Sequence, residues 1–267
     1  MKNKTAKIAA LLLVLVLALS SLTACGKKEE DLDLLGRIKK AGVLQIGTEG
    51  DWAPWTYHDE SDKLVGYDVE IGEAIAEKLG VKANFNETDW DSILAGVDSG
   101  RFDIACNGVS YTEERAEKYD FSEPYAYDDT VLVVAADNED IKGLDDLKGK
   151  TTANTISSAY ADLAKEAGAE VTGVNTLLET IELVTQGRVD ATINAAVSIN
   201  DYLKEHPDTP IKIVGVVYRD TLVYPAKKGE DSATFVKAVN EALDDLRKSG
   251  KLAEISNKYF GMDITNP

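Results

Sequence analysis

"GRFDIACNGV" (residues 100–109) returns further along the chain as "GRVDATINAA" (residues 187–196). Both copies contain Gly-Arg-x-Asp, a short apolar run and an asparagine, and apolar residues stand three and six positions before each first glycine. The four-residue motif alone is weak, so chance is the alternative, but the register of the flanking positions favours a true repeat. Two copies are too few for a solenoid. The repeat therefore predicts two similar lobes.

The segments around both copies alternate between strand and helix patterns. Before the first copy, residues 43–48 form a β-rich run, and residues 67–80 and 90–100 carry apolar side chains at helical spacing. A second set of such patterns follows; its segments are 130–136, 147–155, 159–168, 177–187 and 211–217. Alternation at these lengths predicts parallel sheets covered by helices, so the expected fold class is α/β with two doubly wound lobes.

The chain is expected to cross between the lobes twice, near Asp128 and near Arg219. Lobe one then comprises residues 41–128 and 220–267, and lobe two comprises residues 129–219. Ligands of open parallel sheets sit beyond the carboxyl ends of the strands. Asn107 and Asn194 close equivalent strands, so we expect both to face a ligand pocket between the lobes.

The first residues have the pattern of a secretion signal. Lys2, Lys4 and Lys7 precede the apolar run "IAALLLVLVLAL", which is short for a bilayer-spanning helix. "LTAC" then resembles the bacterial lipobox, which implies cleavage of residues 1–24 and a lipid of the palmitate type on Cys25. An uncleaved signal anchor is the alternative. Residues 25–40, beginning "CGKKEEDLD", are predicted to be a lipidated tether to the membrane.

Charge and cysteine content narrow the function classes. The net charge of −18, which becomes about −21 without the three signal lysines, argues against a nucleic-acid partner. Cys106 is the one cysteine after Cys25, so it is expected to be a small core residue without a disulfide or a metal. His58 and His206 lie in polar stretches and are expected at the surface. We expect no metal and no cofactor.

Arg115 is an unusual residue for its position. Ser110 or Thr112 can cap the helix that follows, and Ser110 and Glu113 have the spacing of a capping box. A cation in the first helical turn opposes the helix dipole, unless an anion binds there to the amide groups and the guanidinium. The alternative is an exposed arginine paired with nearby glutamates.

Three tryptophans, Trp52, Trp55 and Trp90, lie in the loops and helix starts of the first lobe. Core packing explains one of them. Three together favour the apolar walls of a pocket.

The chain as a whole resembles the family 3 solute-binding proteins of bacterial ABC importers, which bind amino acids. The resemblance rests on "IGTEGDWAPWTYHDE", "LVGYDVEIGEAIAEKLG", "SGRFDIACNGVSYTEERAEKYDFSEPY", "GRVDATIN" and "AVNEALDDLRKSGKLAEISNKYFG". It covers residues from about 41 to 261 and implies two α/β lobes of the type II periplasmic-binding-protein kind, joined by two crossing strands, that close on a ligand.

The resemblance also implies roles for individual residues. Arg115 matches the arginine that binds the ligand α-carboxylate, and Ser110 and Gly108 match groups that hold the carboxylate and the ammonium. The other matches are Trp52 (the stacking aromatic), Trp90 (an apolar wall), Glu49 (an acidic residue of some members), Ser158 (a carboxylate-binding hydroxyl) and Tyr160 beside it.

One departure concerns the ligand ammonium. The family usually has an acidic residue after the second strand, where this chain has Asn194, Ala195 and Ala196. Either Glu49 pairs with the ammonium, or the ligand lacks a free α-amine. The segments "AYAD", "GRVDATIN" and "DYLKEHPD" resemble cystine-binding members, so cystine is the first expectation.

The resemblance implies a monomeric protein outside the cell membrane that delivers its amino acid to ABC permease subunits. Two rivals remain. A sensor lipoprotein would present the ligand to a receptor kinase. An enzyme on the same fold would need a carboxylate acting as an acid or a base, for which Glu49 is the one obvious candidate and lacks a visible partner.

Overall fold

The computed structural model describes residues 32–267. The expected signal peptide (residues 1–24) and Cys25 lie outside the described residues. Within the described part, no helix is both long and apolar enough to cross a membrane.

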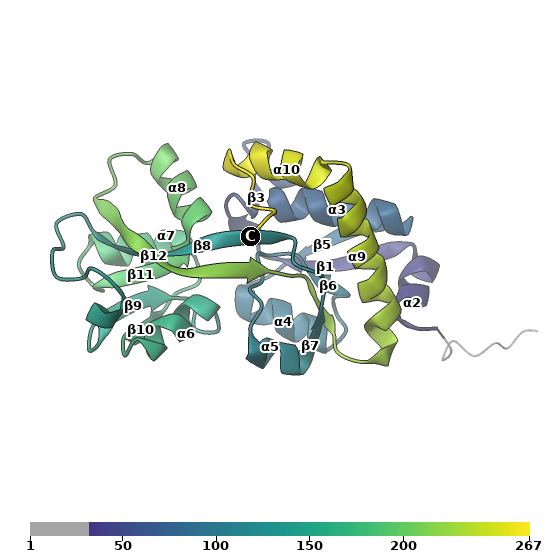
Figure 1. The fold of residues 1–267 in the computed structure, drawn as a ribbon, viewed down its shortest axis with the longest axis horizontal. Coiled ribbons are helices and arrows are strands. Elements are labelled where there is room, and N and C mark those ends of the chain that lie inside the picture. The colour runs from purple at the N-terminus through teal and green to yellow at the C-terminus, as the bar shows by residue number, and fades with distance from the viewer. Residues whose placement is uncertain (1–31) are drawn as a thin grey trace, which may run out of the picture. The chain divides into compact units, whose positions relative to one another are not determined.

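Lobe one is built on a parallel sheet with the strand order β5-β1-β6. Its strands are β1 (Val43–Thr48), β5 (Lys82–Glu87) and β6 (Ile104–Ala105). The helices are α3 (Tyr67–Leu79), α4 (Trp90–Asp98), α5 (Glu113–Lys118), α9 (Ala233–Lys248) and α10 (Lys251–Phe260). Two small sheets complete the lobe: β2 (Asp51–Trp52), β3 (Thr56–His58) and β4 (Leu64–Val65); and β7 (Tyr119–Phe121) with β13 (Pro225–Lys227). Figure 1 shows α9 and α10 on the same lobe as α3, so the end of the chain returns to where it began.

Lobe two has the strand order β10-β9-β11-β8-β12. Its elements are β8 (Ala126–Ala135), η2 (Leu144–Leu147), β9 (Thr151–Asn154), α6 (Ala159–Glu166), β10 (Glu170–Gly173), α7 (Leu177–Thr185), β11 (Ala191–Ala195), α8 (Ala196–Glu205) and β12 (Ile211–Leu222). The strands β9, β10 and β11 are parallel, whereas β8 and β12 run antiparallel to their neighbours. The sheet is therefore mixed where the sequence predicted a parallel one, because two of its strands also connect the lobes.

Alternate residues of β8 explain why helices cover both faces of this sheet. Val131 and Val133 pack in one buried cluster with Ile181 of α7, while Leu132 packs on the other face with Ala164 of α6. Successive side chains of a strand point to opposite faces, so an unbroken apolar run buries both. The expected fold class, α/β with two doubly wound lobes, is confirmed.

The two copies of the repeated sequence make the same local structure. Gly100 and Gly187 end their helices with positive φ angles of 74° and 65°. In the first copy the Asp103 carboxylate accepts a hydrogen bond from the Gln45 amide at 2.8 Å; in the second, the Asp190 carboxylate accepts one from the Thr151 amide at 2.7 Å. The repeated aspartate thus fastens the start of the neighbouring strand in both lobes.

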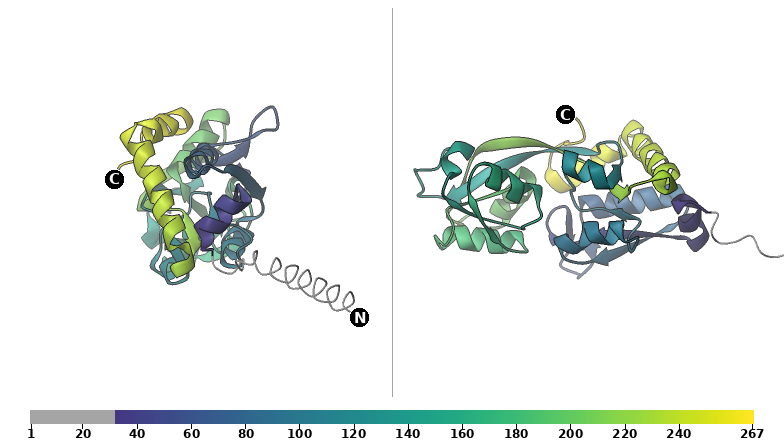
Figure 2. Two further views of the ribbon diagram at one scale, coloured as in Figure 1. Left: turned by 90° about the vertical axis from the view of Figure 1, so that its right-hand side faces the viewer. Right: turned by 90° about the horizontal axis from the view of Figure 1, so that it is seen from below.

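Two strands, β8 and β12, run side by side from one lobe to the other (Figures 1 and 2). Asp128 of β8 lies directly opposite Asp220 of β12 in this ladder. The crossing positions expected from the sequence, near Asp128 and Arg219, fall within these two strands. Both lobes belong to one unit, Leu34–Pro267.

The expected tether is wrong in its last residues. Leu34–Ala41 forms helix α2, in which Ile38 is buried and Arg37 makes a bidentate ion pair with Asp231. The physical reason is that "LLGRIKKA" is amphipathic, and its apolar side chains pack on the core of lobe one. Residues 34–40 therefore belong to the folded protein.

Candidate ligand-binding site

A cavity lies between the lobes. Nine of the ten predicted site residues line it, and Asn107 does not. The lining comprises Glu49, Asp51, Trp52, Trp90, Gly108, Ser110, Arg115, Asn154, Thr155, Ser158, Ala159, Tyr160, Asn175, Thr176, Leu177, Thr180 and Asn194.

Arg115 is 9% exposed and projects toward the cavity from the short helix α5. One guanidinium nitrogen, Nη1, donates to the Ser110 carbonyl at 2.9 Å, and the guanidinium lies 5.4 Å from the ring centre of Trp90. No ion pair joins Arg115 to a carboxylate among residues 32–267, although Glu113 and Glu114 are its neighbours. Burial lowers the pKa of Arg115, but an arginine stays protonated. The alternative of an exposed, glutamate-paired arginine is therefore wrong.

The cap of helix α5 is Thr112 and not Ser110. The Thr112 hydroxyl accepts a hydrogen bond from the Arg115 amide at 3.1 Å. Ser110 stands two residues earlier, in a bridge with Leu222. The predicted capping box between Ser110 and Glu113 does not form, because the helix begins later than that spacing requires.

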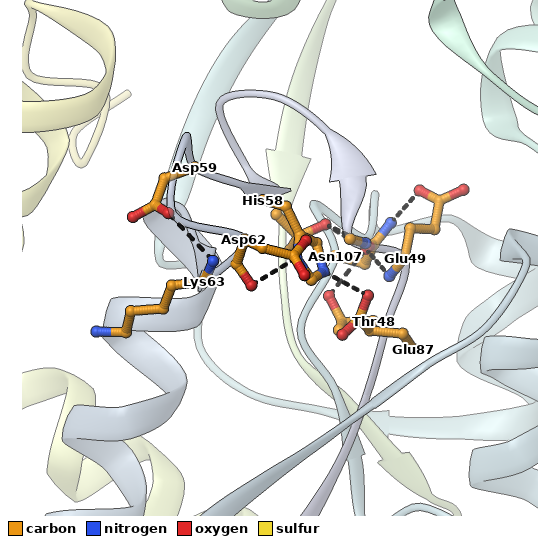
Figure 3. A network of polar contacts seen from close by, with 10 residues as sticks. Thr48, Glu49, His58, Asp59, Asp62, Lys63, Glu87 and Asn107 are labelled. Carbon is orange, nitrogen blue, oxygen red and sulfur yellow. Dashed lines mark hydrogen bonds and ion pairs between the residues drawn. The ribbon is translucent and has the colours of Figure 1, made fainter.

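Glu49, which lines the cavity, is hydrogen-bonded to the buried Asn107 (Figure 3). Asn107 has no exposed surface, and its Nδ2 donates to Glu49 Oε2 at 2.6 Å. Its Oδ1 accepts hydrogen bonds from the Glu49 amide at 2.8 Å and from the hydroxyls of Thr48 and Thr56 at 3.2 Å. The predicted ligand contact of Asn107 is therefore replaced by another role: Asn107 holds Glu49 in place.

The carboxyl group of Glu49 is poorly solvated. Burial raises its pKa to about 7; the hydrogen bond from Asn107 lowers it, and the nearby carboxylates of Asp51 and Asp89 raise it further. Removal from water disfavours the charged form of an acid. A cationic group bound beside Glu49 would reverse this effect.

His58 belongs to a separate surface network, also drawn in Figure 3. Its Nε2 lies 2.8 Å from Glu87 Oε2, and its Nδ1 lies 3.2 Å from the Asp62 carbonyl. His58 and His206 are exposed and Cys106 is 1% exposed, so the surface and core positions predicted for them are confirmed.

The aromatic wall depends on a glycine. Trp52 stacks on the fully buried Trp55, with ring centres 5.5 Å apart, so Trp55 is the core member of the three tryptophans. A Cβ at Gly108 would lie 2.7 Å from the Trp52 ring, and Gly108 has a φ of 53°. The Gly108 amide donates to the buried carboxylate of Asp68 at 2.5 Å. Asp68 thus fixes this backbone, and it is a positioning residue that the sequence did not reveal.

Lobe two contributes neutral polar groups. Asn194 Oδ1 accepts a hydrogen bond from the Ala195 amide at 2.9 Å. The Ser158 hydroxyl caps helix α6: it donates to the Thr155 carbonyl at 2.7 Å and accepts from the Ala161 amide at 3.1 Å. Ser158 therefore lines the cavity as the cap of α6, and the carboxylate-binding role that the resemblance implies for it stays a prediction.

The lobes touch beside the cavity. The Ser157 hydroxyl of lobe two donates to the Asp91 carboxylate of lobe one, and Arg115 Nη2 donates to the Ser157 carbonyl at 3.4 Å. These two hydrogen bonds connect the lobes directly, apart from the crossing strands.

Several lining residues escaped prediction from sequence. Asp51 adjoins Glu49, and the others come from the segments 154–155 and 175–180. Helix α7 begins with a capping box of Thr176 and Glu179. This capping box could have been predicted from the sequence as the start of a helix. It does not predict that the start of this helix lines the cavity.

The lining of the cavity contains charges of both signs. Arg115 is the one basic residue in its lining, whereas Glu49 and Asp51 also line a second, acidic hollow together with Asp89 and Glu179. Among the described residues, no group of three or more His, Cys, Asp or Glu side chains could hold a metal ion. The arrangement fits a small ligand with an anionic group at one end and a cationic group at the other.

A sequence model of the bacterial extracellular solute-binding proteins, family 3, matches residues 44–262. The chain belongs to this family. The chain is similar to the L-cystine-binding protein TcyA of Bacillus subtilis, with 42% identity over 97% of this chain and 99% of that protein. The resemblance stated from the sequence is confirmed.

Two solved structures carry further information. An ancestral arginine-binding protein bound to arginine is 35% identical, with a TM-score of 0.76, over 82% of this chain and 99% of that one. The L-cystine solute receptor of Neisseria gonorrhoeae, in its unliganded open conformation, is 41% identical, with a TM-score of 0.59, over 88% of this chain and 99% of that one. The better superposition falls on the ligand-bound protein despite its lower identity.

Proposed function

We propose that this protein is the extracytoplasmic substrate-binding component of an ABC importer and that it captures a polar amino acid between its lobes. The observation that carries the proposal is Arg115, a buried cation with no carboxylate partner in the described chain, which lines the cavity between the lobes. A guanidinium binds a carboxylate through two parallel hydrogen bonds, and burial strengthens them.

Cystine is the ligand we favour. It is an elongated amino acid with an ammonium and a carboxylate at both ends, and the cavity separates Arg115 from the acidic residues Glu49 and Asp51. The names of TcyA and of the Neisseria gonorrhoeae receptor support this choice.

The setting follows from the same proposal. The protein acts as a monomer, is held at the outer face of the cell membrane by a lipid on Cys25, and delivers its ligand to the permease subunits. An enzymatic role has less support, because the partner of Glu49 is the amide of Asn107, which does not titrate. The relatives reported above are likewise named as binding proteins.

Calorimetric titration of the mature protein with L-cystine and the standard L-amino acids tests the proposal. The protein should bind one ligand per monomer. Arg115→Ala should weaken binding by about 2–5 kcal/mol, because it removes one partner of a buried charge pair. Arg101→Ala is the matched control, since it removes an exposed arginine of the same lobe outside the cavity. Equal affinity in Arg115→Ala and the parent would contradict the assignment.

A further inference from the structure

The proposed function leaves open which group receives the ligand α-amine. In an α-amino acid the amine and the carboxylate share one carbon. A carboxylate bound by Arg115 therefore brings the amine close to Ser110, whose carbonyl lies 2.9 Å from Arg115 Nη1. The group that accepts hydrogen bonds from the amine is therefore expected near Ser110.

Among the described residues, those that lobe two contributes to the lining of the cavity carry no charge. Ala195 and Ala196 follow the end of β11, and the Asn194 side-chain oxygen already accepts from the Ala195 amide. A neutral amide oxygen makes a weaker bond to an ammonium than an ionised acceptor does.

The Ser110 hydroxyl donates a hydrogen bond to a carboxylate outside lobe two's helix ends, that of Asp220. The hydroxyl is 2.5 Å from Oδ2 of Asp220, a residue of the crossing strand β12 that is 3% exposed. An ionised carboxylate can only accept, so the single hydroxyl proton of Ser110 points at Asp220. Because this proton is engaged, Ser110 Oγ can only accept hydrogen bonds from a ligand through its lone pairs. Ser110 lines the cavity, where a ligand would meet it.

The family resemblance already assigns Ser110 to the ligand carboxylate and ammonium. We propose that Asp220 is a positioning residue for that contact: it orients the Ser110 hydroxyl so that Ser110 Oγ accepts from the α-ammonium, and it supplies the negative charge behind that bond. The proposal rests on the function proposed above. In this proposal Asp220 of the crossing strand β12 supplies the negative charge that is missing at the end of β11.

The state of Asp220 agrees with this role. Its second oxygen, Oδ1, is buried and has no hydrogen-bond partner. Burial raises its pKa to about 6, while the hydrogen bonds from the Ser110 hydroxyl and the Thr221 amide and the charge of Arg115 lower it. The group is thus ionised at neutral pH and incompletely satisfied, which leaves it able to respond to a cation nearby.

Glu49 is the competing acceptor, and its position argues against it. Glu49 shares its wall of the cavity with the acidic hollow of Asp51, Asp89 and Glu179, whereas Ser110 shares its wall with a separate hollow that contains Asp220. The two carboxylates therefore adjoin different hollows beside the cavity. Glu49 suits a distal cationic group, and Asp220 suits the α-amine beside Arg115.

The test compares Asp220→Asn with Asp128→Asn. Asp128 is the ideal control because it faces Asp220 across the strand ladder, is also buried, and also has an unpartnered oxygen, but has no hydrogen bond to Ser110. Affinities for L-cystine and the standard L-amino acids are measured by calorimetry at pH 7.5, and stabilities by urea unfolding. The single variant Ser110→Ala and the double variant Ser110→Ala/Asp220→Asn complete a double-mutant cycle.

We expect Asp220→Asn to lower affinity about tenfold, Asp128→Asn to change it less than twofold, and Asp220→Asn to have no further effect once Ser110 is alanine. Stability should be unchanged or higher in both aspartate variants, because each removes a buried charge. An affinity loss that merely follows a stability loss, or an equal loss in Asp128→Asn, would overturn the inference. So would parent-like affinity in Asp220→Asn. A parent that binds no amino acid would instead overturn the proposed function.

Discussion

Ser157 of lobe two donates a hydrogen bond from its hydroxyl to the Asp91 carboxylate of lobe one. The contact lies at the surface, beside the cavity, and Arg115 reaches the Ser157 carbonyl from the same side. The lobes are also connected through the crossing strands β8 and β12, and Ala195 and Val197 of lobe two pack in the core cluster of lobe one. Hinge motion is the default for lobes joined in this way. We therefore expect this pair to favour the closed state.

Asp91→Ala should shift the lobes toward the open state. One hydrogen bond to a charged group contributes about 1.5–3 kcal/mol when buried and less at the surface, so affinity should fall about three- to tenfold. Small-angle scattering without ligand should show a larger radius of gyration than in the parent. Asp98→Ala is the control, because Asp98 is an exposed carboxylate at the other end of the same helix. Identical scattering of Asp91→Ala and the parent would count against the latch.

The carboxyl group of Glu49 should make the ligand-free protein less stable as the pH rises. Its pKa is about 7 in the folded state against an ordinary 4.5, so the folded state binds the proton more tightly. The contribution is most favourable below pH 4.5 and is lost between about pH 4.5 and 7. A shift of this size bounds the change at about 3 kcal/mol. Urea unfolding at a series of pH values should show a shallower decline in Glu49→Gln. The same decline in both proteins would disprove the prediction.

Ligand binding should release protons if a cationic group lies beside Glu49. A bound cation favours the carboxylate, so the pKa of Glu49 falls and affinity rises with pH up to about 7. Calorimetry at pH 6.5 in buffers of different ionisation enthalpy measures the release directly. The release should disappear in Glu49→Gln; an undiminished release would place the proton elsewhere.

Gly108→Ala should disturb the aromatic wall. The added Cβ meets the Trp52 ring at 2.7 Å, and the backbone has a positive φ, so Trp52 must move. Gly187→Ala is a matched control: its φ is also positive, but nothing lies within 4 Å of the added carbon. Both should lose about 1–2 kcal/mol of stability from the left-handed backbone, while only Gly108→Ala should lose ligand affinity. Unfolding and titration of the two variants check this, and equal affinities would contradict it.

Cys25→Ser tests the proposed anchor. Two acyl chains on one glycerol hold a protein stably at a membrane, and the thioether requires the cysteine sulfur. The variant should accumulate as an unprocessed precursor without lipid. Mass spectrometry of membrane and soluble fractions distinguishes the forms. A Cys25→Ser protein that is processed to begin at residue 25 would refute the lipobox interpretation.

The sequence by itself determined the two-lobed α/β plan and most of the chemistry in the cavity. Periodicity located the helices, because an amphipathic helix must bury its apolar face wherever it packs. Gly100 and Gly187 marked equivalent helix ends, because positive φ angles favour glycine. Arg115 could be recognised from the sequence because a cation in the first turn of a helix opposes the helix dipole, and this conflict can be read without knowing the fold.

Only the tertiary structure decided which polar side chains reach the ligand and which support those that do. Asn107 and Asn194 hold the same place in the repeat, yet Asn107 is buried against Glu49 while Asn194 lines the cavity. Asp68 and Asp220 act on Gly108 and Ser110 from distances of 40 and 110 residues along the chain. The physical reason is that a local pattern specifies the face a residue presents, whereas the partner on that face is set by how distant segments pack together.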